Sequence, residues 1–344
     1  MSWIKDKGPL GDVVLSSRIR LARNLSDTPF PSIMDKDMMD AVIHRVHRSI
    51  LGEESPIEDD YQFLMMEDLS SVDQQVLVEK HLASVDLMDK SHRAAILIDE
   101  DEKCSIMINE EDHIRLQCIF PGYQLKEALD YLSNIDDIME RELPYAFQQD
   151  LGYLTSCPTN VGTGMRASVM MHLPALTMTG HMTAIVQTLP KIGVTVRGLY
   201  GEGSEAIGDI YQVSNQVTLG ISEDEIIKNL EVATGQIVDK ERQARQALRD
   251  KGKIYFEDKV WRAYGTLQYA KTMSLKEFMS LLSMVRLGAQ MGIISQVEAM
   301  RINELLVLGQ PGHLRKYGNE NSTIDDLDFV RTKVVLNWLE KNIK

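Results

Sequence analysis

The chain has 344 residues, of which 44% are hydrophobic and 26% charged, which is ordinary for a globular protein and long enough for two domains. Its 51 acidic and 37 basic residues give a formal net charge of −14, which repels nucleic acids and anionic membrane surfaces and argues against direct binding to either. The three cysteines form no Cys-x-x-Cys pair, and neither a secretory leader nor an apolar run of membrane-spanning length occurs, so we expect a cytoplasmic protein without a zinc site.

The first part of the chain predicts a helix followed by a strand meander. Apolar residues recur at spacings of three and four over residues 37–51, which indicates an amphipathic helix. Short strands are predicted over residues 94–98, 104–108 and 113–119, with a turn at 99–102 and a tight acidic corner at 109–112. Connections of this length permit only antiparallel pairing, so parallel β-α-β winding is disfavoured here.

Helices and strands alternate as far as residue 222, and only helices follow. Helical periodicity returns over residues 125–139 and 176–189, and strands are predicted at 168–173, 194–199 and 211–219. This mixture predicts an α+β fold in which a largely antiparallel sheet is flanked by helices. Beyond it the sequence predicts helices over residues 223–249, 275–288, 295–308 and 324–344, with breaks at 250–253 and 309–312.

We therefore expect two domains, an α+β domain at residues 1–250 and an all-helical domain at residues 251–344. The helix at 275–288 carries apolar side chains that look exposed on a helical appendage, and such a surface usually meets a partner. These side chains are Met279, Leu281, Leu282, Met284, Val285 and Leu287. Homodimerisation or docking of a substrate is one expectation for this stripe, and packing against the first domain is the alternative.

No Walker A sequence and no Rossmann glycine fingerprint occurs, but arginines recur inside short polar motifs. In Ser16-Ser17-Arg18-Ile19-Arg20, a strand would place both arginines on one side, where two guanidinium groups can bind adjacent phosphate oxygens. The corner Asn109-Glu110-Glu111-Asp112-His113-x-Arg115 carries three successive carboxylates, which repel one another unless cations lie nearby. Taken separately, the first motif also fits a solvated edge strand and the second a polar hairpin tip.

Two further motifs combine turn-forming residues with reactive side chains. The loop that begins with Cys157-Pro158-Thr159-Asn160 leads through Arg166 into an apolar strand, and it brings backbone N–H groups and a thiol close to a ligand. A lone cysteine is more often a small buried residue, but its place at the head of a polar loop favours function. Glycines surround one arginine and one glutamate in Arg197-Gly198-Leu199-Tyr200-Gly201-Glu202, which indicates either a loop that closes on a substrate or an ordinary turn.

In this order and wording the four motifs resemble the phosphagen (guanidino) kinase superfamily over roughly residues 11–220. In the creatine and arginine kinases a helical domain precedes the S-S-R-x-R motif, whereas here the motif begins at Ser16 and a helical region follows instead. That arrangement resembles the bacterial protein-arginine kinases, as do residues 77–82, which include His81, and residues 309–318. The resemblance implies a kinase that phosphorylates arginine side chains of proteins with ATP, in a site open enough for a guanidinium on a large chain.

The resemblance also implies roles for individual residues. The ATP phosphates would be bound by Arg18, Arg20, Arg115, Arg166 and Arg197, with Mg²⁺ held by phosphate oxygens and water rather than by protein ligands. His81 would lie near the nucleotide. The other expected ATP-binding positions are Ser16, Ser17, Ile19, Ala167, Ser168, Val169, Met170, Gly198, Leu199, Tyr200 and Gly201.

The acceptor guanidinium has a pKa above about 12 and is a poor nucleophile, so it needs a base and a fixed orientation. Glu111 and Glu202 match the family's two substrate-gripping glutamates, and we expect Glu111 to be the base. Cys157 would approach the guanidinium as a thiolate, and Glu110 and Asp112 would tune this catalytic corner.

One motif of the C-terminal part departs from the family. The R-D-x-x-R-A pattern, associated there with allosteric phosphoarginine binding, is matched here only by Asp328 and Arg331. Leucine replaces its first arginine and threonine its final alanine, which disfavours allosteric activation through this site.

By the same resemblance, the expected partners are substrate proteins with exposed arginines, a zinc-binding activator protein, a stress-gene repressor and the Clp protease machinery. The implied setting is a stress response in which phosphoarginine marks proteins for degradation. Two alternatives remain open: a kinase for free arginine or another small guanidino compound, and a catalytically inactive adaptor. The complete set of motif residues argues against the adaptor.

Overall fold

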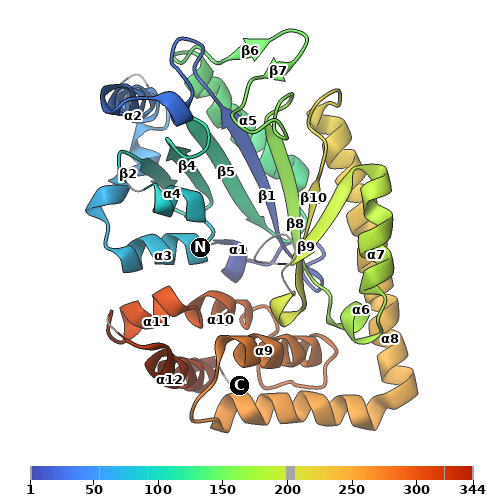
Figure 1. Ribbon diagram of the computed structural model, residues 1–344. Coiled ribbons are helices and arrows are strands. Elements are labelled where there is room, and N and C mark those ends of the chain that lie inside the picture. The colour runs from blue at the N-terminus through green and yellow to red at the C-terminus, as the bar shows by residue number, and fades with distance from the viewer. Residues whose placement is uncertain (1, 54, 91, 199–205, 321, 343–344) are drawn as a thin grey trace.

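An eight-stranded sheet forms the centre of the molecule in this computed structural model, which describes residues 2–53, 55–90, 92–198, 206–320 and 322–342. Every neighbouring pair of its strands is antiparallel. Across the sheet the order is β2 (Tyr61–Met65), β3 (Ala95–Asp99), β4 (Cys104–Ile108), β5 (Ile114–Pro121), β1 (Val14–Arg23), β8 (Met165–His172), β10 (Ile210–Asn215) and β9 (Val194–Gly198) (Figure 1). The predicted α+β class is confirmed, and so is the meander of β3, β4 and β5.

The alternation of side chains along the strands gives the sheet one apolar and one polar face. In β1, Ile19 and Leu21 point into the core, so Arg18 and Arg20 point to the other side. The apolar face packs on α2 (Lys36–Leu51), α5 (Leu125–Glu140) and the first half of α8 (Glu223–Tyr269). Because Arg166 lies directly opposite Arg20, and Arg115 opposite Ala22, the polar face gathers arginines from three adjacent strands.

Short helices cover the outer part of the polar face. The segment between β2 and β3 folds into α3 (Ser71–Glu79) and α4 (Val85–Asp89), whose first turns are capped by Ser70 and Ser84. Leu82 and Leu87 from this segment are buried with Ile96 and Ile98 of β3. The segment between β2 and β3 therefore lies beside the arginines of the polar face. A small hairpin of β6 (Phe147–Gln148) and β7 (Gly152–Tyr153) lies at the opposite end of β1 from α1 (Ser2–Lys5).

The helices of the C-terminal region pack beneath the end of the sheet (Figure 1). They are α9 (Leu275–Gln290), α10 (Asn303–Leu308), α11 (Pro311–Tyr317) and α12 (Ile324–Asn342), together with the second half of α8. All of them except α11 share one hydrophobic cluster with Trp3 and Ile4 of α1 and with Leu15, Met170 and Ile210 of the sheet, whereas Leu314 of α11 is buried against Leu327 and Val334 of α12. The C-terminal region is therefore seated on the sheet by a common core.

This packing corrects the prediction of an exposed apolar stripe on α9. Met279, Leu282, Val285 and Leu287 are buried in the shared cluster, and Leu281 and Met284 pack against it. The alternative, packing against the rest of the chain, is what the structure has. The stripe therefore gives no support to a homodimer.

Three predicted boundaries also differ from the structure. The helix expected at 176–189 is split into α6 (Pro174–Met178) and α7 (Met182–Thr188), because Gly180 adopts a left-handed conformation with φ of 74°. The helix expected at 295–308 exists only as α10, and the buried Val297 and Ile302 that produced its periodicity lie in turns. At the expected linker, only Gly252 leaves the helical conformation within α8. Within the described ranges, no helix has the length and apolarity needed to cross a bilayer.

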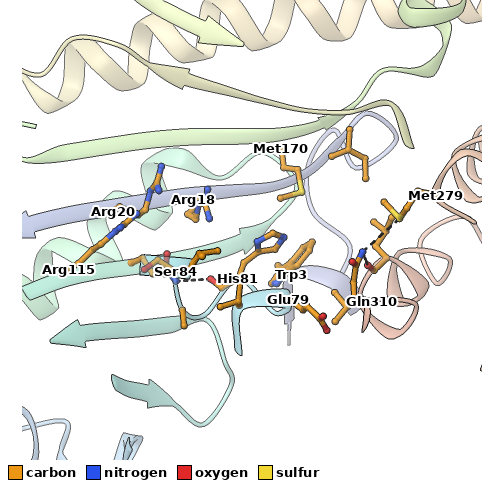
Figure 2. A pocket seen from close by; sticks show the side chains of 17 residues that line it. Trp3, Arg18, Arg20, Glu79, His81, Ser84, Arg115, Met170, Met279 and Gln310 are labelled. Atoms are coloured by element: carbon orange, nitrogen blue, oxygen red, sulfur yellow. Dashed lines mark hydrogen bonds between the residues drawn. The ribbon is translucent and has the colours of Figure 1, made fainter. Parts of the chain in front are cut away.

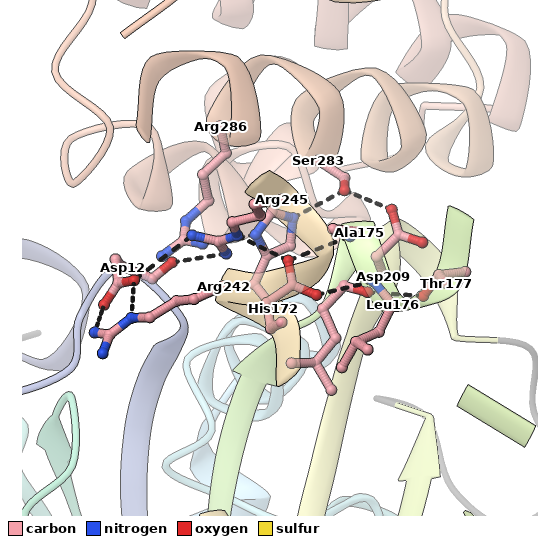
Figure 3. A network of polar contacts seen from close by, with 12 residues as sticks. Asp12, His172, Ala175, Leu176, Thr177, Asp209, Arg242, Arg245, Ser283 and Arg286 are labelled. Carbon is pink, nitrogen blue, oxygen red and sulfur yellow. Dashed lines mark hydrogen bonds and ion pairs between the residues drawn. The ribbon is translucent and has the colours of Figure 1, made fainter. Parts of the chain in front are cut away.

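A buried polar network fastens α9 to the sheet (Figure 3). Arg286 donates to Asn303 Oδ1 at 2.8 Å and to His172 Nδ1 at 2.7 Å. Because arginine only donates, His172 must be a neutral imidazole whose Nε2–H donates to Ser283 Oγ at 2.8 Å. Burial lowers the pKa of His172 well below its usual value, which agrees with this tautomer. The Ser283 hydroxyl then donates to Asp209 Oδ2 at 2.6 Å, so the chain of hydrogen bonds runs in one direction.

We predict that Arg286→Met lowers the free energy of unfolding by about 2–4 kcal/mol, because it leaves buried acceptors on His172 and Asn303 without donors. Urea denaturation measures this. The matched control is Arg262→Met, which removes only an exposed i,i+4 pair with Asp258 and is expected to change stability by less than about 0.5 kcal/mol. Equal stability of the two variants would show that the network does not hold the helical region.

Candidate active site

Two cavities meet on the polar face of the sheet. The first has a volume of about 300 Å³ and the second about 260 Å³. Both are lined by Arg20 and Arg115, so these two arginines stand at their common boundary. The first cavity also contains Arg18 and His81, and the second contains Glu111, Cys157, Asp86, Arg166 and Arg197. Residues from distant parts of the chain thus converge on one double site.

The arginines at this boundary repel one another. Burial, together with the charge of Arg115, lowers the pKa of Arg18 to about 10. Burial and the charges of Arg18, Arg115 and Arg166 lower the pKa of Arg20 well below its usual value. Burial and the charge of Arg197 also lower the pKa of Arg166. A cluster of mutually repelling cations is stabilised by a polyanion, and a triphosphate has the required charge.

Polar neighbours orient the guanidinium groups but leave donors for such an anion. Arg18 Nη2 donates to Gln212 Oε1 at 2.7 Å, and Arg166 donates to Asn160 Oδ1 and to the Asn215 carbonyl, both at 3.3 Å. Arg20 Nε is buried and has no hydrogen-bond partner among the described residues. An unsatisfied cationic donor at this depth fits a phosphate oxygen.

Arg115 belongs to the arginine cage, which comprises Arg18, Arg20, Arg115, Arg166 and Arg197, and it has its own counter-ion. It forms an ion pair with the buried carboxylate of Glu110, which also accepts a hydrogen bond from Ser84 Oγ. Although burial alone would lower the pKa of Arg115, the ion pair with Glu110 raises it. Burial alone would raise the pKa of Glu110, but the ion pair with Arg115 lowers it. The pair fixes one side of the cage between β5 and α4.

The corner between β4 and β5 is held by the other residues of its motif. Asn109 adopts a left-handed conformation with φ of 60°, and its side-chain amide donates to two backbone carbonyls at 3.0 Å. Asp112 Oδ1 accepts from Asn24 Nδ2 and from Ser156 N, both at 2.6 Å. His113 Nδ1 accepts from Leu25 N at 3.0 Å. These buried contacts leave Glu111 as the exposed carboxylate of the corner, at the second cavity.

Negative charge gathers around Glu111. Partial burial of its carboxylate, with the nearby charges of Asp112 and Glu110, raises the pKa of Glu111. Asp86 of α4 lines the same cavity and adds to this shift. A carboxylate with a raised pKa is better suited to accept a proton, and the surrounding negative charge attracts a cation such as guanidinium.

The loop that carries Cys157 is held by Thr218, which lies just after β10. Thr218 Oγ1 donates to the carbonyls of Thr159 at 2.9 Å and Val161 at 2.8 Å. At Gly162, where φ is 113°, a Cβ would lie 2.2 Å from the Thr218 carbonyl oxygen, so the approach requires glycine. Cys157 Sγ lies 3.0 Å from Thr159 Oγ1 and faces the second cavity together with Asn160.

His81 stands in the wall of the first cavity. It has a left-handed φ of 61°, and its carbonyl accepts from Gln117 Nε2 at 2.7 Å. Burial, together with the charge of Arg18, lowers the pKa of His81 to about 3, so the ring is neutral. Its ring centroid lies 5.5 Å from that of Trp3 (Figure 2).

Comparison with known proteins accounts for this geometry. The profile described as ATP:guanido phosphotransferase, C-terminal catalytic domain, matches residues 41–244, and that described as Protein-arginine kinase McsB C-terminal domain matches residues 253–343. The chain belongs to the ATP:guanido phosphotransferase family. It is a phosphotransferase for guanidino groups, and within the family it resembles proteins named protein-arginine kinase.

Two of these relatives span nearly the whole chain. The protein-arginine kinase of Desulforamulus reducens is 49% identical over 335 residues, which cover 97% of this chain and 94% of that protein. The protein-arginine kinase of Bacillus subtilis is 45% identical over 334 residues, with coverages of 97% and 92%. Among solved structures, a lombricine kinase superposes with a TM-score of 0.60 at 25% identity, covering 71% of this chain and 70% of that one. The duplicated taurocyamine kinase of Schistosoma mansoni, at 23% identity and a TM-score of 0.62 over 74% of this chain and 37% of that one, shows the shared fold.

The structure places the predicted site residues of this guanidino kinase in different surroundings. The five arginines, His81, Met170, Glu111, Asp112 and Cys157 line the two cavities, and Glu110 holds Arg115 from behind. Ile19, Ala167 and Val169 face the hydrophobic core, and the Ser17 hydroxyl is bonded to the Gly122 carbonyl, so their side chains position the strands rather than line a cavity. Ser16 and Ser168 are buried and line neither cavity, and Gly198 ends β9. Leu199, Tyr200, Gly201 and Glu202 lie outside the described residues.

Several lining residues escaped the sequence analysis. Asp86, Gln212 and Ser214 of the second cavity and Trp3, Met279, Leu306 and Val307 of the first belong to no motif recognised beforehand, and Glu79 and Gln310 lie in the matching stretches 77–82 and 309–318 without an assigned role. Gln212 could have been found from strand alternation, because it lies opposite Arg197 in the neighbouring strand. The others are brought to the site by tertiary packing alone. Among the residues with described positions, no group of three or more His, Cys, Asp or Glu side chains is placed to hold a metal ion.

The altered motif in α12 has a structural role. Arg331 is buried, and it donates to the Gly309 carbonyl at 2.9 Å and to Asp328 Oδ1 at 2.5 Å. Asp328 and Arg331 are therefore partners of each other and of the chain that enters α11.

We predict that Arg20→Met weakens binding of inorganic tripolyphosphate roughly tenfold to a hundredfold, because one charge-assisted contact is lost. Without ligand, however, this variant is expected to melt no lower than the wild type, since it removes one of several mutually repelling buried cations. Thermal unfolding with and without tripolyphosphate measures both effects. The prediction would be contradicted if Arg20→Met melted far below the wild type without ligand and its melting temperature still rose with tripolyphosphate as that of the wild type does.

Proposed function

We propose that this kinase transfers the γ-phosphate of ATP to arginine side chains of proteins. The observation that carries the proposal is the pair of adjoining cavities with Arg20 and Arg115 at their boundary. One cavity is suited to a nucleotide polyphosphate and the other, with Glu111 and Cys157, to a guanidinium. A phosphate at the boundary would lie between donor and acceptor, which is the alignment that phosphoryl transfer requires.

On the donor side, Arg18, Arg20, Arg115, Arg166 and Arg197 would bind the phosphates. Their positive charge stabilises the charge that develops on the transferred group and on the leaving ADP. Mg²⁺ bound to the phosphates would supply further neutralisation, with oxygen ligands from phosphate and water. The ion pair with Glu110 would keep Arg115 in place as the phosphates bind.

On the acceptor side, Glu111 would take a proton from the guanidinium as a guanidinium nitrogen forms its bond to the γ-phosphorus. The bond between the γ-phosphorus and the bridging oxygen breaks, and ADP leaves with the electron pair. Cys157 and Asp86 face the same cavity and would orient the cationic acceptor by charge and hydrogen bonding. Asp112 acts from behind, because its contacts with Asn24 and Ser156 hold the corner and the cysteine loop together. Glu202 would be the second glutamate on the guanidinium.

The remaining expectations are proposals from the sequence. They comprise a catalytic domain at residues 1–250, a helical domain at 251–344 and a cytoplasmic location. A homodimer stays a proposal to which the buried stripe of α9 gives no support. The proposed partners are a zinc-binding activator, a stress-gene repressor and Clp protease components. Because Arg331 and Asp328 bind each other inside the helical region, we do not assign a phosphoarginine site to them.

The reaction is tested by incubating the enzyme with ATP and a bulk protein, followed by mass spectrometry without acid, because the N–P bond is acid-labile. We expect phosphate on arginine side chains. Phosphorylation of free arginine far faster than of protein would favour the small-guanidine alternative, and no transfer to either would favour the inactive adaptor.

We predict that Glu111→Gln lowers turnover on a protein substrate by about 10²-fold or more, the usual contribution of a general base. ATP affinity should be unchanged, because the phosphates are bound by arginines. The control is Glu127→Gln on the exposed side of α5, which should retain full turnover. Near-normal turnover of Glu111→Gln would sink the proposed mechanism but leave the family assignment intact.

Asp86→Asn is predicted to shift the acidic limb of the kcat/KM profile toward lower pH. Removing this negative charge makes the ionised form of Glu111 easier to reach, so the pKa of Glu111 falls and the base stays active at lower pH. Asp89→Asn in the same helix lies outside both cavities and is the matched control. An acidic limb that moves upward, or moves equally in both variants, would contradict the assignment of Glu111 as base.

A further inference from the structure

The first cavity has a cationic end and an apolar end. Figure 2 shows Arg18, Arg20 and Arg115 gathered on one side and Trp3, Met279 and Gln310 on the other. The apolar end is lined by Trp3, Met170, Ile210, Met279, Leu306 and Val307. A nucleotide whose phosphates occupy the cationic end would extend its sugar and base toward this apolar end.

Much of this apolar wall comes from outside the part of the chain that matches the guanidino phosphotransferase profile. That match covers residues 41–244, whereas Trp3 belongs to α1, Met279 to α9, and Leu306 and Val307 to α10. These segments are held together by the hydrophobic cluster that α1 shares with the C-terminal helices. The wall is therefore a fixed part of the folded chain.

The apolar end also contains an unsatisfied donor. The side chain of Trp3 is only 3% exposed, and its Nε1 has no hydrogen-bond partner among the described residues. A buried indole N–H normally has a partner, and leaving it without one costs about 1–3 kcal/mol. Arg20 Nε is the corresponding orphan donor at the cationic end of the same cavity. Two orphan donors at opposite ends fit one ligand that carries an acceptor at each end.

We propose that α1 and the C-terminal helices form the subsite for the base of the nucleotide, with Trp3 as hydrogen-bond donor and Leu306 as part of its wall. The occupant is a purine nucleotide, because a purine ring has both an aromatic surface for the apolar wall and ring nitrogens that accept a hydrogen bond. His81, neutral and beside Trp3, adds a second aromatic ring to the same wall. The C-terminal region thereby takes part in binding the phosphate donor. This inference rests on the proposed use of ATP.

The test compares ATP with inorganic tripolyphosphate, which has the phosphates but no base. Leu306 is partly buried, so Leu306→Trp can extend into the cavity and fill its apolar end. We expect this variant to bind ATP at least tenfold more weakly, by isothermal titration calorimetry, and to bind tripolyphosphate as the wild type does. Leu308→Trp is the matched control, because Leu308 lies in the same helix with similar burial but does not line the cavity.

Trp3→Phe tests the donor separately, since it keeps an aromatic ring and removes the N–H. We expect a loss of ATP affinity of about threefold to tenfold, the usual value of one hydrogen bond, again without an effect on tripolyphosphate. Retained tripolyphosphate binding shows in each case that the variant is folded.

Unchanged ATP affinity in both variants, or a parallel loss of tripolyphosphate binding, would overturn the subsite. A loss in only one variant overturns the role assigned to the other residue. Wild-type enzyme that binds tripolyphosphate but does not transfer phosphate from ATP would instead refute the proposed function, so the two failures are distinguishable.

Discussion

The arrangement of the site depends on the repulsion between arginines that share one face of a sheet. Burial lowers the pKa values of Arg18, Arg20 and Arg166, and the nearby charge of Arg115 lowers each of them further. The sheet tolerates this because strand alternation fixes where each guanidinium emerges, and because Gln212 binds Arg18 and Asn160 binds Arg166. Binding of a polyanion would relieve this repulsion, so the clustered arginines favour a ligand such as a triphosphate.

In the N-E-E-D-H-x-R corner, most side chains hold the structure and Glu111 alone is presented as the proposed base. Asn109, Asp112 and His113 use their side chains to fix the turn, β1 and the cysteine loop, and Glu110 binds Arg115. Glu111 is then presented to the second cavity from a rigid support. Its raised pKa follows from partial burial and from the nearby carboxylates of Asp112 and Glu110. Replacing any one supporting residue would therefore disturb both the geometry and the proton affinity of the proposed base.

Sequence patterns predicted the elements that depend on neighbouring residues in the chain, such as strands and motif loops. Alternation predicted the strand that contains Arg115, and the resemblance of the motifs to the guanidino kinases indicated which residues would meet in the second cavity. The sequence pattern could not decide which surface an apolar helix face packs against. The side chains of α9 have the same periodicity whether they face a second protomer or the sheet, and only the tertiary packing with Trp3 and Met170 settles the question. Asp86 and Leu306 reach the site for the same reason, since neither lies in a motif.

The C-terminal helices are attached to the strands that carry the arginine cage. Arg286 binds His172 at the end of β8, the strand of Arg166, while Ser283 binds Asp209 just before β10, the strand of Gln212. If the base occupies the wall at α10, the nucleotide contacts both sides of this junction at once. Linkage is reciprocal, so whatever tightens the helices against the sheet must tighten nucleotide binding by the same factor, and nucleotide must stabilise the junction equally. A region that contains none of the phosphate-binding arginines would thereby control how the donor substrate is held.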